Sequence, residues 1–264
     1  MQSRAPSQFH SLRDILPLVF ILSLLLMSFA PIARSRQHDM HDIPDMAMSG
    51  DAQHMAAPAE GPIDKAKRLA DKQESEFNHH LAGFFIFLAG MLLLVQEWLV
   101  PKWPLARYAW PLCFFISGLF VFVFSDTEMW PWGNQSLFYA LSHEPEDLQH
   151  KVFAIILLAL GVVEFQRLLG RWTAPWLPWT FPALSLVGAV LLLFHSHAGG
   201  MHGPNAMRLM ERIQSQHRWY ASIGFAIVVT KGLSEMPIKW RDKFNKIWPV
   251  LLIILGTSLA VYEE

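Results

Sequence analysis

Long runs of apolar residues dominate the chain, and short polar segments separate them. Each run is close to the roughly 20 residues that a helix needs to cross a hydrocarbon core of about 30 Å. The runs are continuous rather than alternating, and only helices or closed barrels satisfy the backbone within lipid. The pattern therefore predicts an all-α fold, a polytopic membrane bundle of about six transmembrane helices. The runs cover about residues 80–100, 106–124, 150–169, 179–197, 218–235 and 246–262.

The segment before the first run has a different character. Arg4 and Arg13 precede an apolar run over 15–30, which is typical of a signal peptide or an uncleaved anchor. The stretch that follows has no periodic apolar face and favours disorder, and then a polar, interfacial helix. We therefore predict three parts. They are a signal peptide or anchor over 1–35, an exported His/Met-rich segment with an interfacial helix over 36–78, and a six-helix transmembrane domain over 79–264.

Composition supports a membrane protein and excludes several other classes. Of the 264 residues 53% are apolar and 16% are charged, against about 25% charged in soluble domains. The net charge of −1 gives no basic field for nucleic acid. Cys113 is the one cysteine, so neither an intrachain disulfide nor a thiolate cluster can form. There is no Cys-x-x-Cys, phosphate-binding glycine loop or His-Glu-x-x-His motif, and we expect a binding or transport protein rather than an enzyme.

The distribution of charge between the runs predicts the orientation. One set of loops is basic, whereas the loop 125–149 holds five acidic residues and no Lys or Arg. By the positive-inside rule the basic loops are cytoplasmic and the acidic loop is outside. The N-terminal segment and the C-terminus then also lie outside, and only the loop 198–217, with Arg208 and Arg212, departs from the rule. The basic set consists of Lys102, Arg107, Arg167, Arg171, Lys239, Arg241, Lys243 and Lys246.

Histidines follow the same asymmetry. Of the 12 histidines, all except His10 fall on the outer side of the predicted topology. Imidazole is the commonest metal ligand, and packing alone explains such a gathering poorly. Met207 and Met210 share a helical stripe with His217, a donor set that suits Cu(I). The alternative is that these methionines pack on a neighbouring helix. The histidines near the predicted interface are His79, His80, His143, His150, His195, His197, His202 and His217.

The exported segment carries further donors for copper. Its thioethers would take Cu(I), and its imidazoles and aspartates would take Cu(II), whereas the simpler interpretation is a solvated linker. The donors are His38, Met40, His41, Met46, Met48, His54 and Met55.

The membrane part resembles the copper resistance protein D family of bacterial inner-membrane proteins. The resemblance is carried by His79-His80-Leu81-Ala82-Gly83 and His195-Ser196-His197-Ala198-Gly199-Gly200, and it covers about 79–262. It implies a protein of the bacterial inner membrane that handles copper together with exported copper-binding proteins, such as a periplasmic copper chaperone. Family members often have more spans, so this chain would be a short or divergent member.

Three functional hypotheses follow. The first is a protein that captures, buffers or transfers copper at the periplasmic face, with the lipid bilayer as its surroundings. The second is a b-type haem cytochrome subunit, with iron held by two histidines such as His150 and His217. The third is a membrane subunit of a larger complex, with the histidines as a docking surface or pH sensor. Glu97 and Glu164 near the inner ends are either functional carboxylates or interfacial ones.

Overall fold

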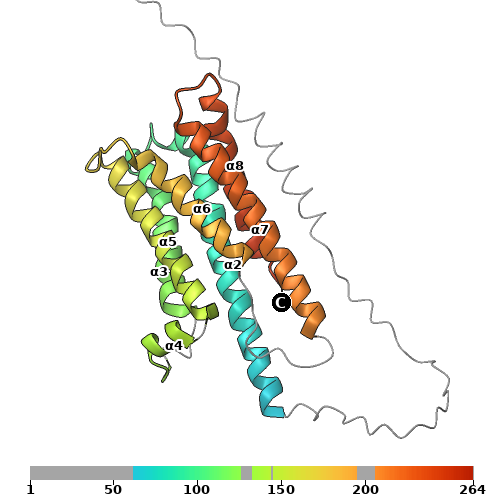
Figure 1. The fold of residues 1–264 in the computed structure, drawn as a ribbon. Helices are drawn as coiled ribbons and strands as arrows, with labels where there is room; N and C mark the ends of the chain where they lie inside the picture. Colours follow the sequence, from blue (N-terminus) through green and yellow to red (C-terminus); the bar gives the residue numbers. More distant parts are fainter. Residues whose placement is uncertain (1–61, 126–132, 144, 195–205, 264) are drawn as a thin grey trace, which may run out of the picture. The chain divides into compact units, whose positions relative to one another are not determined.

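The structure is a computed structural model that describes residues 62–125, 133–143, 145–194 and 206–263. Within these ranges the regular structure is helical, without β-strands, as predicted (Figure 1). The predictions for the first 61 residues, and those for His195, His197 and His202, lie outside the described residues. The helices are α2 (Pro62–Leu99), η1 (Pro104–Tyr108), α3 (Ala109–Phe124), α4 (Leu137–His143), α5 (Pro145–Leu168), η2 (Leu177–Trp179), α6 (Thr180–Leu193), α7 (Ala206–Glu235) and α8 (Arg241–Ala260).

Four of the described helical segments are long and apolar enough to cross a membrane. They correspond to the first, second, third and sixth predicted runs. The other two predicted spans have different properties: the apolar helix Leu177–Leu193 is shorter, and α7 carries charged residues in its first half and in its last turns. A multi-pass membrane protein is therefore compatible with the structure, and the count of six spans stays a prediction. The four segments are Leu69–Leu99, Pro104–Phe124, Asp147–Leu168 and Arg241–Ala260.

Glycines allow the helices to approach closely. A Cβ placed on Gly83 of α2 would lie 2.6 Å from the carbonyl oxygen of Gly256 in α8. A Cβ on Gly118 of α3 would lie 2.7 Å from the backbone nitrogen of Leu158 in α5. Membrane helices use small residues in this way, because van der Waals packing drives their association. The two crossings fix α2 against α8 and α3 against α5.

The remaining contacts join these pairs into one bundle. The helix α5 packs beside α6, α6 beside α7, and α7 beside α8. Near one end of the bundle the core is aromatic: Trp110 of α3, Phe181 of α6 and Trp248 of α8 pack with ring centroids 5.3–6.4 Å apart. The rings connect three helices at the level where α3 and α6 begin.

The bundle has two chemically different ends. We call "histidine end" the region of His79 and His80 in α2, His150 at the start of α5, His217 in α7 and Tyr262 after α8. We call "charged end" the region of Gln96, Glu164, Arg167, Lys231 and Glu235. The rise of 1.5 Å per residue places Gln96 about 25 Å along α2 from His79. This separation is close to the thickness of a hydrocarbon core, about 30 Å.

Candidate metal-binding site at the histidine end

Three aromatic side chains from three different parts of the chain meet at the histidine end. The ring of His79 in α2 stacks on that of Tyr262, with centroids 4.0 Å apart. The ring of His217 in α7 lies 6.2 Å from that of His79 and 6.3 Å from that of Tyr262. The sequence predicted both histidines as site residues, and the fold brings them together.

Both histidines are held in the same tautomer. Nδ1 of His79 lies 2.8 Å from the carbonyl oxygen of Ser75, and Nδ1 of His217 lies 2.9 Å from that of Ile213. A carbonyl only accepts, so each Nδ1 is assigned as the donor. The nitrogen that can then bind a metal ion is Nε2, and a backbone carbonyl on Nδ1 commonly fixes a metal-binding imidazole in this way.

The distance between the two rings suits a shared ion. With each Nε2 about 2 Å from one metal ion, two imidazole centroids stand roughly 5–6.5 Å apart, depending on the angle at the metal. The observed 6.2 Å lies within this range. His217 is 1% exposed and Tyr262 is 0% exposed, so the His79–His217 pair is shielded from solvent on the side of these two residues.

His80 is engaged differently from its neighbour. Its Nε2 lies 2.8 Å from the carbonyl oxygen of Tyr262, which fastens α2 to the residues after α8. Adjacent helical residues diverge by about 100°, and here one imidazole stacks on the Tyr262 ring while the other contacts its backbone. Of the two, His79 is therefore better placed to bind a metal together with His217.

A buried lysine adds positive charge near this end. Nζ of Lys151 donates to the carbonyl oxygen of Phe122 at 3.0 Å and to Oγ of Ser125 at 3.0 Å. Nδ2 of Asn78 in α2 donates to the carbonyl oxygen of Ser125 at 3.2 Å. An ammonium at the C-terminus of α3 is favourable because the helix dipole is negative there. The half-buried His150 precedes this lysine, and together these contacts tie α2, α3 and α5 at one level.

The other predicted ligands in the described residues are more exposed. His143 in α4 stacks on Tyr139 at 4.3 Å and contacts Ser142 and the Tyr139 carbonyl oxygen, all within its own helix. Met207 is 74% exposed and Met210 is 39% exposed on α7. These exposures argue against the alternative that both thioethers pack into a protein core.

The described residues supply a pair of histidines rather than a complete site. Among them there is no group of three or more His, Cys, Asp or Glu side chains placed to hold a metal ion. The remaining predicted ligands lie outside the described residues. They are His195, His197, His202 and the donors between His38 and Met55. The arrangement places two imidazole rings from different helices at a separation that suits one shared ion.

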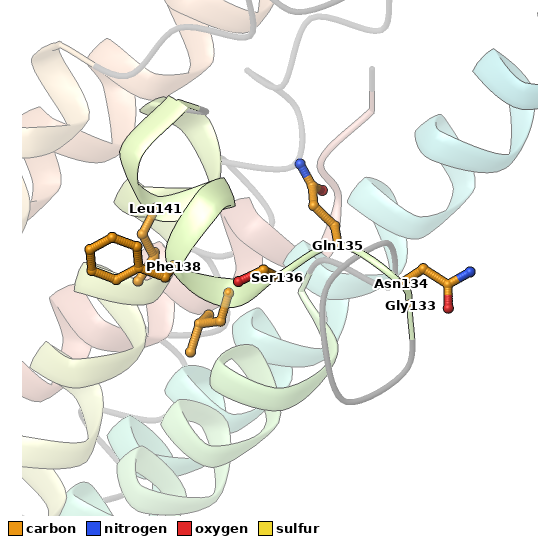
Figure 2. Close-up of a pocket in the computed structure, with 7 residues that line it drawn as sticks. Gly133, Asn134, Gln135, Ser136, Phe138 and Leu141 are labelled. Atoms are coloured by element: carbon orange, nitrogen blue, oxygen red, sulfur yellow. The ribbon is translucent and has the colours of Figure 1, made fainter.

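A cavity elsewhere has no metal-binding side chains. A space of about 530 Å³ is lined by one short stretch, Gly133–Leu137 with Phe138 and Leu141 (Figure 2). Phe138 and Leu141 lie on the same side of this stretch in Figure 2, away from Asn134, and Phe138 is 83% exposed. We assign the cavity no function, because its lining is local and carries no charge.

Sequence reasoning missed several residues that the structure places at the two ends. Tyr262 gave no signal, because one aromatic residue near a chain end has no periodic context. Lys151 and Lys231 were visible as charges beside or inside apolar runs, which marks a functional suspect in a membrane helix. Glu164 was identified on that ground, and its partners Arg167 and Glu235 were not.

Comparisons with known proteins give no further information on the site. No protein-family model, curated protein or solved structure matches the chain. The function is therefore argued from the chemistry of the site alone.

Proposed function

We propose that this chain is a copper-binding membrane protein that captures, buffers or transfers copper at the outer face of the bacterial inner membrane. The observation that carries the proposal is the pair His79 and His217, with ring centroids 6.2 Å apart and both Nδ1 atoms bonded to backbone carbonyls. The pair brings two imidazole rings from different helices to a separation that suits one shared ion. This fits the resemblance to the copper resistance protein D family.

The donor types favour copper over harder cations. Imidazole suits Cu and Zn, and thioether sulfur selects Cu(I) in particular. Met207 and Met210 stand exposed on the same helix as His217, about two to three turns before it. We propose that the donors from His38 to Met55 collect the ion outside the membrane. The methionines and His202 would pass it on, and His79 and His217, aided by His195 and His197, would hold it.

The charge of the loops supports a location of the histidine end at the outer face. The loops next to the charged end hold the basic residues Lys102, Arg107, Arg171 and Lys239. Positively charged loops remain cytoplasmic, so the histidine end would face the periplasm. A periplasmic copper chaperone could then deliver or receive the ion there.

The contact between Tyr262 and His79 favours a single ion over a haem in the space between His79 and His217. The Tyr262 ring lies 4.0 Å from the His79 ring and 6.3 Å from the His217 ring. A porphyrin between these histidines would have to displace a fully buried tyrosine, whereas a single ion would not.

The test is the copper content of the purified full-length protein, prepared in detergent without chelators and loaded with Cu(I) under anaerobic conditions. To separate the helical site from the exported segment, each variant is also prepared without residues 36–55. We expect the shortened protein to retain copper, and His79→Ala combined with His217→Ala to lose most of it. His143→Ala is the matched control, because its imidazole is exposed and bonded within α4.

Two results would overturn the proposal. Copper content that is the same in the double variant and in the wild type would remove the His79–His217 site. A Soret band with sharp reduced α and β bands in the protein as purified would instead identify a haem protein.

A further inference from the structure

The charged end holds four ionisable side chains from two helices. Glu164 and Arg167 come from α5, and Lys231 and Glu235 come from α7. Arg167 donates from one nitrogen to both carboxylate oxygens of Glu164, at 2.7 and 3.0 Å. Lys231 contacts Glu235, and Arg167 lies 3.7 Å from the same carboxylate. We call these four residues the charged quartet.

Three members of the quartet are well buried, and Arg167 is partly exposed. The side chains of Glu164, Lys231 and Glu235 are 5%, 7% and 11% exposed. Nζ of Lys231 also lies 4.9 Å from the ring centroid of Trp248, an arrangement that favours a cation. Burying such pairs is costly compared with packing apolar side chains of the same volume. A role in stability is therefore a weak explanation for the quartet.

The quartet opens onto a polar cavity. A space of about 280 Å³ is lined by all four residues and by the amides of Gln96 in α2 and Asn245 in α8. At about 30 Å³ for each water molecule, it has room for several. Each lining residue stands within about one or two turns of the end of its helix, so the cavity lies at the mouth of the bundle.

The chemistry of the quartet limits which class of ligand could bind in the cavity. Both carboxylates already contact cations, and the described residues contain no group of three metal-binding side chains here. Both cations likewise face carboxylates, which leaves little attraction for an anion. Two acidic and two basic side chains balance, and a proton is the one species that could change the charge of the quartet without a further set of ligands.

We propose that the charged quartet is a proton-binding site that exchanges protons with water in the 280 Å³ cavity. We assign Glu164 as the group that holds the proton, because it is the less exposed of the two carboxylates that line the cavity. The charged groups facing it are Arg167, Lys231 and Glu235, and the lining residues of α2 and α8 are neutral. Buried carboxylates such as Glu164 belong to the Asp, Glu and His chains that carry protons in membrane pumps and transporters. The site is independent of the proposed copper site about 25 Å away.

The test is infrared difference spectroscopy of the full-length protein between acid and neutral pH, in H₂O and in D₂O. We expect a carbonyl stretch of a protonated carboxylic acid that shifts to lower frequency in D₂O. The band should disappear in Glu164→Gln and persist in Glu97→Gln, an exposed residue outside the cavity.

A second pair of variants keeps the proposal testable if Glu164→Gln does not fold. We expect Glu235→Gln to retain the band and Lys231→Met to change its pH dependence, because the ammonium is one of the charges facing Glu164. The proposal is overturned if the wild type lacks the band, or if no substitution in the quartet affects it. Either result would mean that the quartet is a permanently ionised contact between α5 and α7.

Discussion

The two ends of the bundle hold their polar side chains in different ways, although some of the same helices form both. At the histidine end, rings from α2, α7 and the residues after α8 pack against one another, and every donated hydrogen bond we describe for His79, His80 and His217 goes to a backbone carbonyl. At the charged end, side chains from α5 and α7 neutralise one another. The first arrangement orients imidazole rings through backbone carbonyls, as the hydrogen-bond partners of metal ligands do. The second balances two acidic side chains with two basic ones. We therefore expect substitutions of the histidines to lower mainly copper binding, and substitutions at the charged end to lower mainly stability.

The largest loss of stability is expected at the charged end. Lys231→Met leaves Glu235 with Arg167 alone and removes the ammonium from the Trp248 ring. Breaking one side of a buried pair typically costs about 3–5 kcal/mol. Thermal unfolding in detergent measures the change. Lys243→Met is the control, because Lys243 is an exposed cation over Trp240 in the same region. Equal stability of the two variants would show that Lys231 is not held in a buried ion pair.

The crossing of α2 and α8 gives the next effect, and it concerns the histidine end. Gly256→Ala places a methyl group against the backbone of Phe87, so we expect a loss of about 1–3 kcal/mol. Gly188→Ala in α6 is the matched substitution, since its Cβ would meet nothing closer than 3.9 Å. It should be neutral or stabilising, because alanine favours a helix over glycine by about 1 kcal/mol. If both variants unfold at the same temperature, α2 and α8 do not approach each other as closely as described above.

Substitution of a histidine should affect binding more than folding. His217→Ala removes a buried ring and one hydrogen bond, and we expect a loss of about 1–2 kcal/mol together with most of the bound copper. Unfolding temperature and metal content are measured on the same preparation. A variant that keeps its copper but unfolds far more easily would assign His217 a structural role instead.

The smallest effect is expected at the rim of the histidine end. Arg212 pairs with Glu263 at 3.0 Å, with side chains 38% and 70% exposed. Exposed ion pairs contribute about 0–1 kcal/mol, so Arg212→Ala should change neither stability nor copper content measurably. A large drop in copper content would show that charge at this rim, rather than the histidine pair, attracts the ion.

Much of the fold could be predicted from the sequence, because the signal depends on apolar length. Four predicted runs match helices that are long and apolar enough to span a membrane. The polar stretch after Pro62 forms a helix that continues into the first apolar run, as expected. The helix α7 was less predictable, because it combines charged turns with an apolar middle. Local composition does not reveal whether such a helix crosses the membrane.

The site could be predicted only in part, because it depends on how the helices are rotated. The sequence identified His79, His80 and His217 as candidates, but periodicity alone does not say which of two adjacent histidines faces α7. The stacking of Tyr262 on His79 depends on the position of the last described residues beside α2, which no motif indicates. Glu164 was recognised because a carboxylate in an apolar run is rare. Its partners lie one turn along α5 and on α7, which only the fold connects.

The most direct test of the account is the sidedness of the two ends. Single cysteines are introduced in a Cys113→Ala background, as Ser142→Cys at the histidine end and Lys102→Cys at the charged end, both at exposed positions. Bacterial spheroplasts expressing each variant are treated with a thiol reagent that does not cross the membrane. We expect Ser142→Cys to be labelled in intact spheroplasts and Lys102→Cys only after permeabilisation. Labelling of both cysteines from the same side, or in the reverse order, would contradict a histidine end that faces the periplasm.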